Sequence, residues 1–114
     1  MARAETSHAE LRRSLERHLG AENEVIFPAY EALADVSSTP TRLLREEHER
    51  IGLLLAECAT VIATQDPEQA IESFSVMAET LIKHHDKEEQ MFLPMASQAL
   101  AAQREEILER LKQR

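Results

Sequence analysis

The sequence has few of the residues that build tight turns and disulfides. Its 114 residues include two glycines, four prolines, one cysteine and no tryptophan. An all-β fold needs many tight turns, so this scarcity argues against one. A single cysteine excludes an internal disulfide and a four-thiolate zinc site. It fits a reducing cytoplasm, where we expect the protein to reside.

Long apolar runs and excess positive charge are missing as well. The longest apolar stretch, near residues 52–56, is far too short to cross a bilayer, and the first ten residues, MARAETSHAE, contain no apolar run typical of a signal peptide. The chain carries 13 basic and 21 acidic residues, a formal net charge of −8. This charge disfavours nucleic acid and anionic membranes, so we expect neither as a partner.

Alanine, leucine, glutamate and arginine are abundant, and they favour helices. Ser7 and Glu10 have the spacing of a capping box, and Thr-Pro at 39–40 and Asp-Pro at 66–67 place a proline in the first turn of a helix. We therefore interpret residues 1–114 as a single all-α domain, an antiparallel up-down helical bundle.

Three long helices and a short one are expected from these signals. They cover about residues 7–33, 40–64, 67–96 and, for the short amphipathic helix, 103–114. Pro28 and Pro94 fall inside helical pattern, where each removes a backbone hydrogen bond and should bend or end its helix.

Two similar blocks occur near these prolines, HLGAENEVIFP at residues 18–28 and HHDKEEQMFLP at 84–94. Each has a histidine, a glutamate four residues later and a proline ten residues after the histidine. A spacing of four places histidine and glutamate on one helical face, about 6 Å apart, so that both could serve one metal centre. In the second block His85 competes with His84, and the distance to the proline favours His84.

Polar residues occupy the apolar stripes of all three long helices. The first stripe comprises Leu11, Leu15, His18, Glu22, Ile26 (or Val25), Ala29 and Leu33; the second Leu44, His48, Ile51, Leu55, Cys58 and Ile62; the third Phe74, Met77, Leu81, His84, Glu88, Met91 and Met95. These steps of three and four residues indicate core-facing helix sides. A buried carboxylate without a partner is costly, so these groups should be hydrogen-bonded, charge-paired or bound to metal.

Heights along the bundle support part of this grouping. His48 lies 17 residues before Gln65 and His84 lies 17 residues after Pro67, so both should sit about 25 Å from that connection and face each other. The first helix fits less well: its His-Glu pair lies about 18–24 Å from the end of the helix, whereas His48 lies only about 12 Å beyond Pro40.

Other residues receive simpler interpretations. We expect His8 at the surface, Glu24 and Glu89 in solvent, and the following residues in the core: Cys58, Met77, Met91 and Met95. Glu47 could orient the outer ring nitrogen of His48.

The two blocks, together with EEHERI around His48, resemble the hemerythrin-like, or HHE cation-binding, domains over roughly residues 8–96. The resemblance implies a four-helix bundle with a non-haem di-iron centre, in which Glu22 and Glu88 bridge two irons, His18 binds one, and His48 and His84 bind the other. It also implies a further helix and histidine ligand before the first block. This sequence shows neither, so the groove would be filled by the tail or by a second subunit in a homodimer.

Imidazole and carboxylate donors without thiolate favour iron, manganese or zinc, and the resemblance favours iron. It further implies a protein that binds or senses dioxygen, nitric oxide or iron, with peroxide as another small ligand. No nucleophile-and-base pattern is present, so we expect a binding or sensing module and not an enzyme, with redox catalysis left open. The alternative is a helical dimerisation or interaction protein whose polar core layer holds an incidental metal or none.

Overall fold

The computed structural model describes residues 2–33 and 39–114, which contain no strand and form four continuous helical stretches. They are built from α1 (Ala2–Ala21), the π-helical turn η1 (Glu22–Ile26) and α2 (Phe27–Glu31); from α3 (Thr39–Ala63); from α4 (Pro67–Lys87), the π-helical turn η2 (Glu88–Phe92) and α5 (Leu93–Ala99); and from the 3₁₀ turn η3 (Ala101–Gln103) and α6 (Arg104–Lys112). The predicted all-α fold is confirmed.

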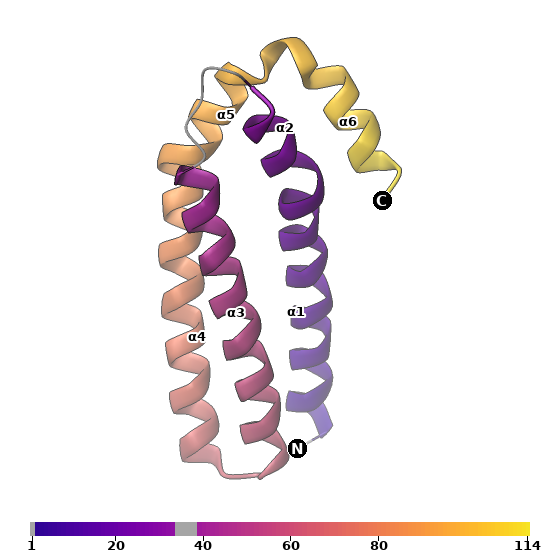
Figure 1. The fold of residues 1–114 in the computed structure, drawn as a ribbon. Coiled ribbons are helices and arrows are strands. Elements are labelled where there is room, and N and C mark those ends of the chain that lie inside the picture. Colours follow the sequence, from indigo (N-terminus) through magenta and orange to yellow (C-terminus); the bar gives the residue numbers. More distant parts are fainter. Residues whose placement is uncertain (1, 34–38) are drawn as a thin grey trace.

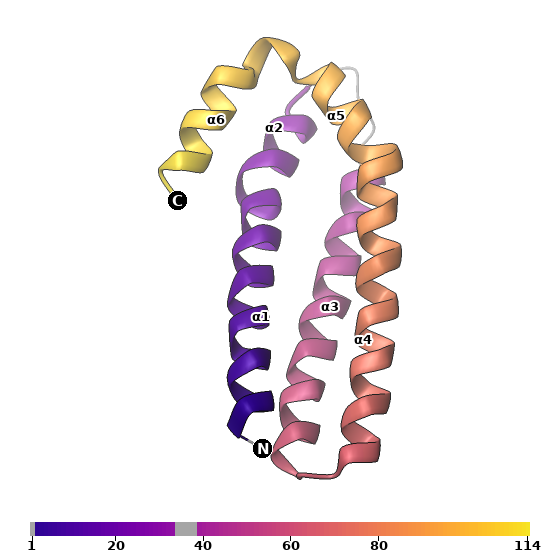
Figure 2. The ribbon, with the colours of Figure 1, turned by 180° about the vertical axis from the view of Figure 1, so that it is seen from behind.

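The helices α1, α3 and α4 run side by side along the molecule, and α3 packs against both of the others (Figure 1). Seen from behind, α1 and α4 flank α3, which is the most distant of the three (Figure 2). After α5 the chain turns over the end of the bundle, and α6 runs back outside α1 and contacts η1. None of the described helices is long and apolar enough to span a bilayer.

Two helix starts can be compared with the expected signals. The Asp66 side chain accepts hydrogen bonds from the backbone N–H groups of Glu68 and Gln69, as an N-cap should. The prediction of a capping box at Ser7 is wrong, because α1 already begins at Ala2 and Ser7 lies inside it. The preceding Ala-Arg-Ala-Glu segment consists of good helix formers that extend the helix backward. Residues 35–38 of the expected polar connection lie outside the described residues.

The core consists of two apolar clusters. One contains Leu19, Ile51, Leu54, Leu55, Cys58 and Met77. The other contains Phe27, Tyr30, Leu44, Phe92, Ala96 and Leu100. Along the chain, four buried polar residues lie between members of these two clusters: Glu22, His48, His84 and Glu88.

Neither internal proline ends its helix, because a π-helical turn precedes each one. The N–H of Phe27 donates to the carbonyl of Glu22, and the N–H of Leu93 donates to that of Glu88, five residues back in both cases. Each wide turn accommodates an additional residue and therefore rotates the helix beyond it.

This rotation overturns part of the predicted core. Phe92 and Ala96 are buried in place of Met91 and Met95, which are exposed, Met91 by 69%. Phe74, also expected in the core, is 39% exposed. The predicted burial of Met77 is confirmed.

The surface position expected for His8 is also wrong. Its side chain is buried, and Nε2 donates a hydrogen bond to the Leu55 carbonyl, 3.0 Å away. His8 lies three residues before Leu11 and seven before Leu15, so it continues the inward stripe once α1 extends past it.

Burial within α3 predicts a sharp contrast between two nearby residues. Ile51 is fully buried, whereas Leu53 is 72% exposed. We expect Ile51→Ala to lower the free energy of unfolding by about 2–5 kcal/mol because it leaves a cavity. The matched control, Leu53→Ala, should change it by no more than about 0.5 kcal/mol. Urea denaturation with a chelator present measures both, and equal losses would contradict the packing of α3.

Candidate metal centre

The two helices of the first hairpin bring Glu22 level with His48. Glu22 lies nine residues before the end of α2 at Glu31, and His48 lies nine residues after the start of α3 at Thr39. The height difference expected from the sequence is thus removed, because α2 ends earlier than expected. His18 lies about one helical turn from Glu22, toward the start of α1.

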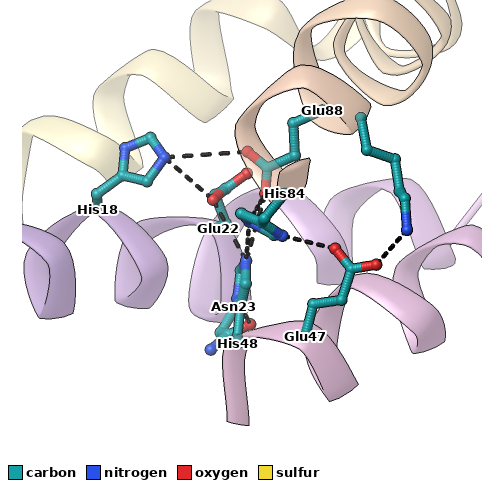
Figure 3. Close-up of polar contacts among 8 residues, drawn as sticks. His18, Glu22, Asn23, Glu47, His48, His84 and Glu88 are labelled. Carbon is teal, nitrogen blue, oxygen red and sulfur yellow. Dashed lines mark hydrogen bonds and ion pairs between the residues drawn. The ribbon is translucent and has the colours of Figure 1, made fainter. Parts of the chain in front are cut away.

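Four buried side chains converge in the layer between the two apolar clusters (Figure 3). Glu22, His48, His84 and Glu88 each offer a ligand atom, and these atoms lie within 4.8 Å of one another. His48 Nε2 is 3.1 Å from His84 Nε2, 3.3 Å from Glu88 Oε1 and 3.5 Å from Glu22 Oε1. His84 Nε2 is 2.5 Å from Glu88 Oε1.

His18, the fifth candidate, lies at the edge of this group. Its Nε2 is 3.2 Å from Glu22 Oε1 and 3.9 Å from Glu88 Oε2, but its side chain is 59% exposed. The structure places His84 inside the group and His85 outside it, where His85 is exposed and pairs with Glu89 at 3.0 Å.

Each of the two buried imidazoles is held from its other nitrogen. His48 Nδ1 donates to Asn23 Oδ1 at 2.9 Å, and His84 Nδ1 donates to Glu47 Oε1 at 2.8 Å. Lys87 binds the second oxygen of Glu47. The expectation that Glu47 orients His48 is wrong, because Glu47 reaches α4 instead. Sequence reasoning missed Asn23, whose one visible signal was its place directly after Glu22.

Aromatic contacts fix the plane of the His48 ring. The Phe27 ring stacks on it with centroids 5.4 Å apart and planes 25° from parallel. The Arg45 guanidinium lies 5.3 Å from the centroid of the Phe27 ring and pairs with Glu31 at 2.9 Å. This stack includes a cation–π contact and covers one face of the His48 ring.

Burial perturbs the ionisable groups of the layer. Desolvation, together with the neighbouring Glu88 carboxyl, raises the pKa of Glu22 to about 9. Desolvation would also raise the pKa of Glu88, but its contacts with His48 and His84 outweigh it and hold that pKa well below its usual range. Burial opposes the charged form of His84, yet its bonds to Glu88 and Glu47 prevail and raise its pKa. Without a metal, the proton that Glu22 keeps and the raised pKa of His84 both reduce the negative charge of the layer.

The donor set fits a divalent cation. Glu22 Oε1 is buried and, among the described residues, receives no hydrogen bond of good geometry, although His18 and His48 lie nearby. Ligand atoms about 2.1 Å from one ion lie at most about 4.2 Å apart, so the group needs only a small contraction. The thiol of Cys58 is not among these donors. It lies in the apolar cluster that contains Met77, and its Sγ is 3.1 Å from Ser73 Oγ. Imidazole with carboxylate suits iron, manganese or zinc.

A helical bundle with imidazoles and carboxylates converging in its core is a construction typical of metal-binding proteins. The chain belongs to the hemerythrin HHE cation binding domain family, whose model matches residues 1–96. Membership confirms the resemblance and implies a metal-binding site, for which iron is the typical metal. Searches of curated proteins and of solved structures found no match.

The raised pKa of Glu22 predicts how pH affects the metal-free protein. Glu22 keeps its proton up to about pH 9 when folded and only to about 4.5 when unfolded. Its contribution is therefore complete below pH 4.5, and the free energy of unfolding should fall by about 1.4 kcal/mol per pH unit as pH rises toward 9. His84 acts in the same direction.

Glu22→Gln should flatten this slope, whereas the exposed control Glu79→Gln should keep it. Denaturation in chelator across pH 5–9 measures the effect. A slope unchanged by Glu22→Gln would contradict the assigned protonation.

Proposed function

We propose that this chain is a non-haem di-iron protein that binds or senses a small ligand such as dioxygen, nitric oxide or peroxide, or senses iron itself. The observation that supports this most is the convergence of Glu22, His48, His84 and Glu88 in one buried layer. A single free cysteine suits work in a reducing cytoplasm. We assign binding or sensing and not catalysis.

In this proposal Glu22 and Glu88 would offer their carboxylate oxygens to both metal positions. His48 and His84 serve one position, and His18 serves the other. When bound, ferrous iron supplies an open coordination position to a small ligand. The apolar clusters above and below exclude water from the layer, and the ligand enters on the side where His18 is exposed.

Iron loading tests the proposal with two adjacent histidines. Anaerobic addition of ferrous iron should give about two irons per wild-type chain, because five donors face two positions. Admission of dioxygen should then produce a new near-ultraviolet charge-transfer band. His84→Ala should lose most of the iron and the band, whereas His85→Ala should keep both because His85 is exposed outside the group. Iron content equal in both variants would refute the site.

A second candidate function, self-association, is favoured by the outer side of α4. Ile71, Phe74, Ala78 and Ile82 follow one another at steps of three, four and four residues, so they form one stripe. All four are exposed and none is charged, in a chain of net charge −8. Two copies could bury this stripe against each other, and we propose a second copy of this chain as its partner.

Solution mass tests this association. Wild-type protein at tens of micromolar should sediment as a dimer, and Phe74→Glu should be monomeric because it places a charge in the apolar contact. Leu53→Glu adds the same charge at an exposed position on α3 and should remain dimeric. A monomeric wild-type protein would eliminate this candidate, and association without metal binding would favour interaction as the function.

A further inference from the structure

We propose that the two metal positions are unequal: a closed position at His48 and His84 holds its ion tightly, and an open position at His18 holds its ion weakly and exchangeably. The inference rests on the proposed metal binding and goes beyond it. It attributes the difference to Asn23 and Glu47. These two residues position His48 and His84, and no described residue does the same for His18.

The closed position is organised before any ion arrives. The bonds from Asn23 and Glu47 occupy Nδ1 of the two buried imidazoles and direct both Nε2 atoms at the carboxylates. Phe27 further restrains the His48 ring. Little side-chain freedom is left to lose on binding, and such outer hydrogen bonds commonly contribute about 10- to 100-fold to metal affinity.

The open position lacks this support. His18 faces the same two carboxylates from α1, but it is the most exposed of the five candidate ligands. Within the described part of the chain, no residue is bonded to its Nδ1. Binding must therefore immobilise a solvated imidazole, and water can compete for the ion.

The two blocks of the repeat differ in the residue that follows the glutamate. In the first block Asn23 follows the glutamate and turns toward α3, where it holds His48. In the second block Glu89 occupies the corresponding place, but it points outward and pairs with His85. The repeat therefore duplicates the histidine and the glutamate, whereas the hydrogen bond that Asn23 makes has no counterpart in the second block.

Titration of the metal-free protein with Co²⁺ tests the inequality, because visible absorption and calorimetry both follow binding. Wild type should bind in two steps whose affinities differ by a factor of about ten or more. His18→Ala should remove the weak step and leave the tight one within about threefold. Asn23→Leu should weaken the tight step about 10- to 100-fold, and Asn23→Asp, which keeps an acceptor oxygen, should restore it.

Glu89→Gln is the matched control and should leave both steps unchanged. Circular dichroism in chelator verifies that each variant is folded. The inference is overturned by two steps of equal affinity, by a single step that survives His18→Ala, or by a tight step insensitive to Asn23→Leu in a folded variant. A separate result, cobalt binding no greater than that of a His48→Ala, His84→Ala double variant, would instead refute the proposed metal binding.

Discussion

The cost of burying two carboxyl groups beside two imidazoles is the constraint on which this molecule depends. Glu22 and Glu88 meet between two apolar clusters, where uncompensated charge is strongly unfavourable. Without metal, protons and the close contact of His84 with Glu88 compensate it. A divalent cation can replace those protons, so metal binding, proton release and stability of the core are coupled.

The π-helical turns are the backbone's part of the same arrangement. Each begins at a glutamate of the polar layer and ends two residues before a proline. Proline has no N–H to donate. In each π-helical turn the residue before the proline donates to the carbonyl five residues back, so the helix continues with little loss of backbone hydrogen bonding. The rotation then turns Phe27 and Phe92 inward, where they meet edge to face at 5.4 Å above the polar layer.

Local patterns were sufficient to predict the helices, the start at Asp66, the buried stripe of α3 and the pairing of His48 with His84. These features depend on neighbouring residues and on simple helix geometry. The exposure of Met91 and Met95 could not be predicted, because it follows from a changed hydrogen-bond register.

The partners of the buried histidines were missed for a related reason. The Asn23–His48 and Glu47–His84 contacts join residues 25 and 37 positions apart, and they depend on how helices rotate against one another. Periodicity within one helix carries no information on that rotation. His8 differs, since its spacing from Leu11 and Leu15 already placed it on the inward stripe and only the assumed helix start concealed this.

The π-helical turns also matter for protein design in which these two blocks are grafted onto another scaffold. A designer who copies either block onto an ideal straight helix would reproduce the histidine–glutamate spacing. Everything downstream, however, would be misdirected by about 100° per surplus residue. In such a graft the thioethers of η2 and α5 would enter the interior and the phenyl group would leave it. A scaffold that reproduces this core must therefore include the π-helical turn as well as the ligand residues.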